Sequence, residues 1–279
     1  MFNIFRKKSS PKDMKPGSMP KGPCGEIVTS SIISLPHGFS TRRGGVSEGI
    51  FDSLNLGMNR GDDKEKVIEN YHRFLNACRI DQEEFVCGKQ VHGSEVLQVF
   101  REDAKKPYGY EELFEADGYV TNIPLVPLVI FTADCIPLLL ADEDNEVVAA
   151  VHCGWRSTVA DIEKNAIDKM LILGAQKDNI KASIGPAIEK CCFEVGEEVV
   201  TQAENLLGCS LNNLCEKKDN GKYMLDLKGV LKKRLLQLGL LESNIEIIKE
   251  CTMCNPDKYW SHRYTNGERG SQANIIMLK

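Results

Sequence analysis

The chain has 279 residues, of which 42% are hydrophobic and 27% are charged, and its formal net charge is −5 at pH 7. This composition is ordinary for a globular protein, and the length is sufficient for one large domain or two small ones. No apolar run reaches the roughly 18 residues that a membrane helix needs, which excludes an integral membrane protein. The acidic balance disfavours nucleic-acid binding through a basic face.

Residues 1–31 are expected to form an N-terminal lead-in that is at least partly flexible. Its first 23 residues are rich in Ser, Pro, Gly and Lys and contain no apolar stretch, which is typical of disorder and not of a secretory signal. The chain contains eleven cysteines, an odd number, which favours reduced thiols and a cytoplasmic location over a disulfide framework. Residues 32–279 are expected to form a single domain.

Apolar segments alternate with helical patterns along this body, which predicts a mixed α/β fold. In chain order, the expected elements are a helix over 63–78, a strand over 94–100, two short buried strands within 125–140, a strand over 146–152, a helix ending near 173, a strand over 180–184, helices over 196–207 and 226–238, and strands over 245–249 and 273–278. The break within 125–140 is expected near Asp134 and Cys135. Thr158 and Asp161 predict a capping box, and Gly174 predicts the end of that helix.

Three soft donors stand at the ends of these predicted elements. His92 precedes a strand, Cys135 interrupts the most apolar stretch, and His152 ends a strand before a glycine turn. Two imidazoles and one thiolate are a sufficient donor set for Zn²⁺ and leave a fourth position open for water. Each residue also has an ordinary interpretation, as a surface histidine or a core cysteine. Strand alternation directs Cys153 to the face opposite His152.

Basic residues form a second set. Arg42 begins an Arg-Arg-Gly-Gly turn, Arg156 precedes a helix, and Arg263 lies in a Ser-His-Arg segment, so each is a candidate for binding an anion. Scattered arginines are more often surface ion-pair partners. The chain has neither a Walker loop nor a G-x-G-x-x-G segment, which disfavours nucleotide binding by those routes.

The remaining cysteine pairs have no obvious chemistry. Cys251 and Cys254 form a single CxxC without a second one to complete a structural zinc site, and Cys191 and Cys192 are adjacent. We assign both pairs to packing.

Several segments together resemble one family. They are His37-Gly-Phe-Ser-Thr-Arg-Arg-Gly-Gly-Val-Ser47, Ser53-Leu-Asn-Leu-Gly57, Gln90-Val-His-Gly93, Ala116-Asp-Gly118, Thr132-Ala-Asp-Cys135, Val151-His-Cys-Gly-Trp-Arg156, Gly185-Pro-Ala-Ile188, Cys192-Phe-Glu-Val-Gly196 and Ser261-His-Arg263. This series is similar to the laccase-domain or polyphenol-oxidase-like family, also called peptidoglycan editing factor. Members of that family are regarded as purine nucleoside phosphorylases with adenosine deaminase activity.

The resemblance implies a four-layer α/β/β/α sandwich with mixed sheets. It places the family's metal ligands on His92, Cys135 and His152, the residues that the donor chemistry had selected, and makes them the catalytic residues. It also implies substrate or phosphate contacts by residues in the shared motifs. These are Arg42, Asn55, Gln90, Asp134, Arg156 and Arg263.

Two positions depart from the family pattern, and the histidine content of the chain is inconsistent with the activity that the name laccase describes. The C-terminal Thr-Gly-Arg of the family is replaced by Glu268-Arg-Gly-Ser271, which shifts the arginine, and Phe193 stands where tyrosine is common. A multicopper oxidase needs several His-x-His pairs. The chain has five histidines and no such pair, so copper binding is conceivable but true laccase chemistry is excluded.

The leading hypothesis is a zinc-dependent enzyme for purine nucleosides. It would cleave adenosine, inosine or methylthioadenosine with phosphate and would deaminate adenosine, with zinc-activated hydroxide attacking C6 and Asp134 as a candidate for moving protons. The alternative is a cysteine hydrolase that edits a cell-wall peptide precursor, with Cys135 as nucleophile and His152 as base. A non-catalytic binding protein is the third possibility. The oligomeric state does not follow from the sequence.

Overall fold

The computed structural model describes residues 24–109 and 114–279, and the lead-in expected over residues 1–23 lies outside them. Residues 24–31 contact the body. Strand β1 (Ile27–Val28) pairs with β2 (His37–Ser40), and the Ser30 hydroxyl donates a hydrogen bond to Glu246. The folded body therefore begins before residue 32.

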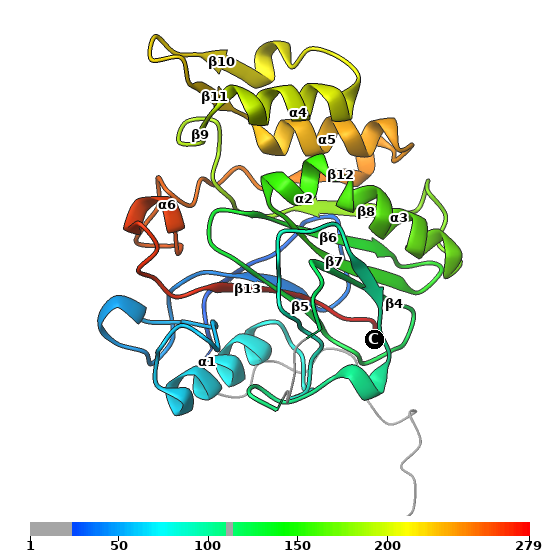
Figure 1. Ribbon diagram of the computed structural model, residues 1–279. Helices are drawn as coiled ribbons and strands as arrows, with labels where there is room; N and C mark the ends of the chain where they lie inside the picture. Colours follow the sequence, from blue (N-terminus) through cyan, green and yellow to red (C-terminus); the bar gives the residue numbers. More distant parts are fainter. Residues whose placement is uncertain (1–23, 110–113) are drawn as a thin grey trace, which may run out of the picture.

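Two large β-sheets lie face to face at the centre of the molecule (Figure 1). The six-stranded sheet has the order β12 (Ile245–Ile247), β8 (Lys181–Ile184), β6 (Ile136–Asp142), β7 (Val147–Cys153), β4 (Gly118–Thr121) and β3 (Val96–Gln98). The four-stranded sheet has the order β1, β2, β13 (Gln272–Ile276) and β5 (Leu128–Thr132). The first sheet is mixed, since β3–β4 and β8–β12 are parallel pairs, whereas every pair in the second is antiparallel.

Helices α1 to α5 cover the two outer faces, and the short helix α6 lies to one side of the sheets (Figure 1). These helices are α1 (Lys64–Ala77), α2 (Trp155–Val159), α3 (Ile162–Ile172), α4 (Glu197–Leu207), α5 (Leu227–Gln237) and α6 (His262–Thr265), with 3₁₀ turns at Gly49–Phe51, Arg101–Asp103, Asn212–Leu214 and Glu242–Asn244. Helix α1 lies on the four-stranded sheet, and α2 to α5 share one hydrophobic cluster with the six-stranded sheet. A small antiparallel sheet of β10 (Cys215–Lys217), β11 (Tyr223–Leu225) and β9 (Glu194–Val195) adjoins α4.

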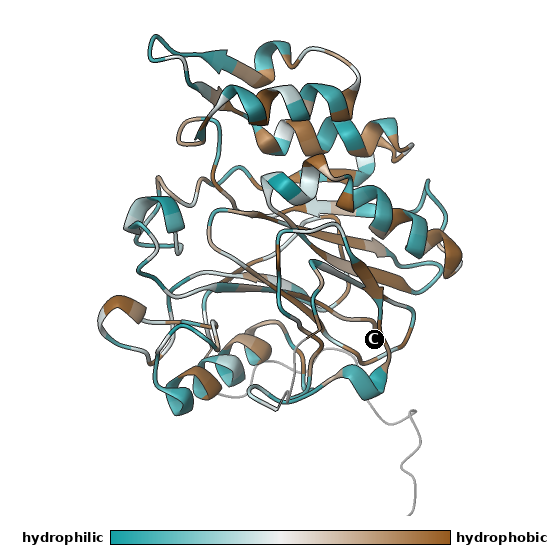
Figure 2. Cartoon of the chain, in the orientation of Figure 1, coloured by the Kyte–Doolittle hydropathy of each residue, from teal (hydrophilic) through white to brown (hydrophobic). Residues whose placement is uncertain are grey.

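Strand alternation explains the four layers, because successive side chains point to opposite faces of a sheet. On β7, the side chains of Val147, Ala149 and Val151 face the helices. Val148 and Ala150, which alternate with them, face the other sheet. Both sheets are thus buried on two faces, which accounts for their nearly continuous apolar strands (Figure 2). The α/β/β/α arrangement is confirmed.

Several sequence predictions are confirmed at the level of single elements. Asp63 caps α1 by accepting hydrogen bonds from the backbone N–H groups of Glu65 and Lys66. The chain breaks between β5 and β6 where Asp134 takes a φ of 85°, and Gly174 ends α3 with a φ of 104°. None of the helices in the described ranges has both the length and the apolar character needed to cross a membrane.

The helix predicted to end near residue 173 is two helices, and the predicted capping box is wrong. Asp161 adopts a left-handed conformation, with φ of 63°, between α2 and α3 and makes no side-chain cap. Its carboxylate instead accepts two hydrogen bonds from Arg234, at 2.8 and 2.6 Å. An ion pair from α5, which local sequence spacing does not reveal, therefore replaces the local capping interaction.

Candidate metal centre

Three donor atoms converge at the end of the six-stranded sheet. Ligand atoms of His92, Cys135 and His152 lie within 4.8 Å of one another, and we call these residues the metal centre. His152 is on β7, Cys135 follows the break before β6, and His92 lies in the loop before β3. The register of β6 and β7 pairs Pro137 with His152, which brings Cys135 alongside the imidazole.

The spacing suits one tetrahedral ion. The distance from Cys135 Sγ to His92 Nε2 is 3.9 Å, whereas a sulfur and a nitrogen on one zinc ion lie about 3.6 Å apart. The two imidazole rings meet edge to face with centroids 4.9 Å apart, so their nitrogens converge without stacking. His92 is exposed and His152 is buried, which leaves one side of the centre open to solvent.

Gly154 provides the space for this convergence. Its φ of −63° is available to any residue, so conformational freedom does not account for the glycine. A Cβ at this position would lie 3.0 Å from His92 Cδ2, 3.4 Å from Cys135 Sγ and 3.6 Å from His152 Cε1. A larger residue would therefore occupy the space between the three donors. Cys153, by contrast, is buried among the helix-facing core residues, as strand alternation predicts.

Asp117 orients both histidines. Its carboxylate accepts hydrogen bonds from His152 Nδ1 at 2.7 Å and from the backbone N–H groups of Val91, His92 and Gly93 at 3.1, 3.0 and 2.8 Å. The bond to Nδ1 leaves Nε2 of His152 free to act as a ligand, and a carboxylate behind a metal-bound histidine is a recurring arrangement. The backbone bonds also hold His92 at its strained φ of 59°.

These donors perturb each other's protonation. Burial on its own raises the pKa of Cys135, but the charge of His152 and hydrogen bonds from both imidazoles lower it to about 6. Burial lowers the pKa of His152, but the Cys135 thiolate and Asp117 raise it to about 9. Both pKa shifts favour the thiolate–imidazolium form of the pair. A thiolate is the form that binds zinc, and it is also the form that acts as a nucleophile.

Asp134 connects the metal centre to the C-terminal part of the chain. Its carboxylate accepts hydrogen bonds from the Thr252 hydroxyl at 2.6 Å and from the backbone N–H of Arg263 at 2.7 Å. Its backbone carbonyl accepts one from Ile188 N–H at 2.9 Å. Asp134 is buried, and these bonds stabilise its unusual backbone conformation beside Cys135.

Basic side chains gather on the same side of the metal centre. His262 and Arg269 each lie close enough to Arg60 and Asp134 for their charges to interact, and Arg263 acts on His262 in the same way. We call Arg60, His262, Arg263 and Arg269 the basic group. Burial and the charge of Arg60 lower the pKa of Arg269 to about 10. Arg269 Nε is buried and has no hydrogen-bond partner in the described part of the chain.

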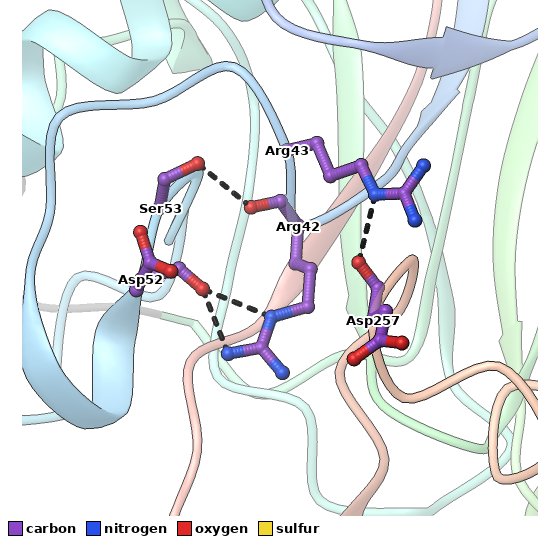
Figure 3. Close-up of a pocket in the computed structure, with 5 residues that line it drawn as sticks. All are labelled: Arg42, Arg43, Asp52, Ser53 and Asp257. Carbon is purple, nitrogen blue, oxygen red and sulfur yellow. Dashed lines mark hydrogen bonds between the residues drawn. The ribbon is translucent and has the colours of Figure 1, made fainter.

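Arg42 lies in a separate small pocket of about 190 Å³, together with Arg43, Asp52, Ser53 and Asp257 (Figure 3). Its guanidinium donates to the carbonyl of Asp52 at 2.9 and 2.7 Å and to that of Pro256 at 2.8 Å. It also stacks on Trp260, with Cζ 4.0 Å from the ring centroid. Three of its five N–H donors therefore hold the backbone, and none of the residues lining this pocket belongs to the metal centre.

The other predicted contact residues have structural partners. Gln90 exchanges two hydrogen bonds with the backbone of Phe131, at 2.8 and 2.6 Å. The Asn55 amide donates to Asp62 and accepts from the backbone N–H groups of Gly57 and Ser271. Arg156 is exposed and lies over the Trp155 ring. Their predicted substrate contacts stay predictions.

Sequence reasoning missed Asp117 and Arg269 as site residues. Asp117 lies in a segment that contributed to the family resemblance, but its role depends on the pairing of β4 with β7, which places it opposite His152. Arg269 was noticed only as a departure from the family pattern. Its burial beside Asp134 and Cys135 is a tertiary property without a local sequence signal.

Comparison with known proteins identifies the family. The profile of the family described as multi-copper polyphenol oxidoreductase laccase matches residues 36–279. The chain belongs to this family. As a family member it is 35% identical over 252 residues to a purine nucleoside phosphorylase of Deinococcus radiodurans, and the match covers 90% of this chain and 92% of the relative. It is also 31% identical over 229 residues to adenosine deaminase RL5 of an unknown prokaryotic organism, covering 81% and 87% of the two chains.

A solved family structure confirms the fold. The crystal structure of the Bacillus licheniformis hypothetical protein YfiH matches with a TM-score of 0.82 and 31% identity, and the match covers 87% of this chain and 92% of that one. The family's relatives thus carry the names of nucleoside enzymes, and the resemblance found in the sequence is confirmed.

Proposed function

We propose that this family member is a zinc-dependent enzyme that cleaves purine nucleosides with phosphate and deaminates adenosine. The observation that carries the proposal is the convergence of His92, Cys135 and His152 within 4.8 Å, with Asp117 behind them, in a chain whose relatives are named for both reactions. Two nitrogens and one sulfur suit zinc and leave a fourth coordination position for water or substrate. Bound zinc would supply a Lewis acid that lowers the pKa of water.

The residues of the chain would position the metal and the substrate. Asp117 holds both histidines in their ligating orientation, and Gly154 keeps the space between the donors free. Asp134 is buried beside Cys135, and its carboxylate is already directed by Thr252 and Arg263. A polar group fixed in this way orients a substrate at low entropic cost.

We assign phosphate binding to the basic group and not to Arg42. Arg269 is half-buried and lies beside Arg60. One of its terminal nitrogens donates to the Gly270 carbonyl and the Ser271 hydroxyl, but its buried Nε has no partner in the described part of the chain, so an anion would relieve both the unsatisfied donor and the repulsion. Arg263, predicted from the sequence, belongs to this group. The hydrogen bonds of the Arg42 guanidinium go to the backbone carbonyls of Asp52 and Pro256. We therefore assign Arg42 the structural role of holding its own turn against the segment that contains Pro256.

In phosphorolysis, a phosphate oxygen forms a bond to C1′ of the ribose as the bond from C1′ to the purine nitrogen breaks, and the base leaves with the bonding electrons and gains a proton. The basic group would hold the phosphate dianion through this step. In deamination, water adds to C6 and ammonia leaves. The substrates would thus be purine nucleosides and phosphate, without nucleic acid or membrane.

One observation favours a different enzyme. A thiolate beside an imidazolium, with the pKa of Cys135 about 6 and that of His152 about 9, is also the arrangement of a cysteine hydrolase, which could act on a cell-wall peptide. The third donor, His92, and the open space at Gly154 favour a metal over this use. All eleven cysteines are free thiols, which accords with the cytoplasm as the proposed location.

The test is incubation of the purified protein with adenosine, with and without phosphate, followed by separation of the products. Phosphate-dependent adenine together with ribose 1-phosphate reports phosphorolysis, and phosphate-independent inosine reports deamination. Activity that chelation abolishes and zinc restores supports the metal enzyme. Adenosine turnover that survives chelation would contradict the metal enzyme. The cysteine hydrolase would instead be supported by metal-independent cleavage of a cell-wall peptide that alkylation of Cys135 abolishes.

A further inference from the structure

A second group of soft ligands lies outside the metal centre. Cys191 and Cys192 precede β9, and Cys251 and Cys254 lie after β12, about sixty residues further along the chain. The four sulfur atoms lie within 4.8 Å of one another. We call these residues the cysteine cluster. The fold brings together two cysteine pairs that the sequence analysis assigned separately to packing.

The sulfur spacing fits one tetrahedral ion. Cys254 Sγ lies 3.5 Å from Cys191 Sγ and 3.3 Å from Cys192 Sγ. Sulfurs that share a disulfide are about 2.05 Å apart, whereas four sulfurs at 2.3 Å from one zinc ion lie about 3.8 Å apart. A polynuclear iron–sulfur cluster assigns its cysteines to different irons and spreads them further. We propose that Cys191, Cys192, Cys251 and Cys254 bind a structural Zn²⁺ ion.

The surroundings of the cluster are suited to a thiolate site. Backbone N–H groups of Glu189 and Cys254 donate hydrogen bonds to the Cys251 sulfur, which is how a CxxC turn commonly supports a bound metal. Four thiolates with Zn²⁺ carry a net charge of −2. Lys228 is 3% exposed, hydrogen-bonds to Glu189 at 3.1 Å and to the carbonyl of Ile248 at 2.8 Å, and lies close enough to Cys251 to interact with its charge. A buried ammonium offsets part of that negative charge.

The cluster would fix one wall of the metal centre. Cys251 forms a β-bridge with Ala187, and Thr252 N–H donates to the Ala187 carbonyl at 3.1 Å. The Thr252 hydroxyl is the group that directs Asp134. A zinc ion joining the 191–192 and 251–254 segments would therefore hold Thr252 in place without contacting substrate. Its binding does not depend on the proposed nucleoside chemistry.

The test is the zinc content of protein purified under reducing, anaerobic conditions, measured for the wild type, one variant of the metal centre, one variant of the cysteine cluster and one control variant. We expect two zinc ions per wild-type chain, one for Cys135→Ala and one for Cys254→Ser. Cys209→Ser is the matched control, because Cys209 is an exposed thiol outside both groups, and it should retain two. If the wild type and Cys135→Ala each held one ion, the cysteine cluster would be supported and the metal centre rejected.

A second measurement does not depend on the folding of Cys254→Ser. Replacing zinc by Co²⁺ in Cys135→Ala should give the intense visible absorption of tetrahedral cobalt bound by four thiolates, and the four cluster thiols should resist alkylation until the metal is removed. Three results for Cys135→Ala would overturn the proposal. The purified variant could lack zinc and have four reactive cluster thiols, it could have disulfides among the cluster cysteines, or it could contain iron in place of zinc.

Discussion

The metal centre and the cysteine cluster are both built from soft ligands near the ends of strands, and both contain exposed and buried donors, but they differ in the number of donors. The metal centre has three donors, an exposed histidine and a glycine that keeps its interior open. The cysteine cluster has four donors, which would complete the tetrahedral coordination of one ion. Catalytic zinc sites keep a position for water or substrate, whereas structural sites are closed by protein. Ligand number therefore separates a site suited to chemistry from a site suited to stability.

The largest effect is expected for loss of a ligand at the metal centre. Cys135→Ala should reduce adenosine turnover by more than about a hundredfold, because even residues that only support metal ligands contribute 10–100-fold. Its melting temperature should change little, since most of the core lies elsewhere. Cys254→Ser should show the opposite pattern, losing about 2–3 kcal/mol of unfolding free energy, or roughly 5 °C, with a smaller loss of turnover. Equal effects of the two variants on both quantities would contradict the division.

The next effect concerns the carboxylate behind the histidines. Asp117→Asn should weaken zinc binding by about 10–100-fold, because an amide cannot accept all four hydrogen bonds. Competition with a zinc chelator measures the change. Asp142→Asn is a matched control, since Asp142 is equally buried and accepts bonds from Asn145 and Gln176 far from either ligand group. A loss of zinc affinity in both variants would show a general effect of destabilisation.

The basic group should respond to phosphate, and Arg42 should not. Arg269→Gln is expected to raise the KM for phosphate about tenfold, corresponding to about 1.5 kcal/mol for a charged hydrogen bond, and to leave deamination nearly unchanged. Arg42→Ala should instead lower the melting temperature, because its guanidinium joins Asp52 to Pro256. Steady-state kinetics at varied phosphate distinguish the two. If Arg42→Ala raised the KM for phosphate more than Arg269→Gln did, the phosphate site would lie at the Arg42 turn, as the sequence predicted.

The smallest effect lies on the opposite side of the six-stranded sheet and concerns stability alone. Glu163 is fully buried on α3, its carboxylate oxygens have no partner in the described ranges, and burial raises its pKa to about 8. Because the folded-state pKa lies above the unfolded value near 4.5, the carboxyl's contribution to stability is complete below pH 4.5 and is lost as pH rises to about 8.

The unfolding free energy of the wild type should therefore fall between pH 5 and pH 9. In Glu163→Gln this fall should be smaller by about 1–3 kcal/mol. Urea titrations at both pH values measure it, with the exposed Glu102→Gln as control. An unchanged pH dependence in Glu163→Gln would mean that this carboxyl is ionised in the folded protein.

Sequence reasoning reached the ligands more readily than their supports. His92, Cys135 and His152 could be selected because each interrupts or ends an apolar segment and carries a donor atom. Asp117 could not, since a buried aspartate in a loop has no distinguishing local pattern until β4 is paired with β7. The cysteine cluster was missed for the same reason. Its halves approach through the parallel pairing of β8 with β12, and strand order does not follow from periodicity.

The elements themselves followed local patterns where local forces decide. Helix α1 has its cap and its apolar face within one segment, and a helix was predicted over 63–78. The capping box at Thr158 and Asp161 failed because Arg234, from a distant helix, binds Asp161. The four layers came from the family resemblance, and the packing of two doubly buried sheets explains them.

We propose above that zinc at the metal centre supports the nucleoside chemistry. The most direct measurement is adenosine turnover as zinc is returned to chelator-treated protein, compared between the wild type and Cys135→Ala. Wild-type activity should rise in proportion to the zinc bound at the metal centre, which is the difference in zinc content between the wild type and Cys135→Ala, and Cys135→Ala should stay inactive at every zinc concentration. Full turnover by wild-type protein free of metal, or full turnover by zinc-loaded Cys135→Ala, would contradict it.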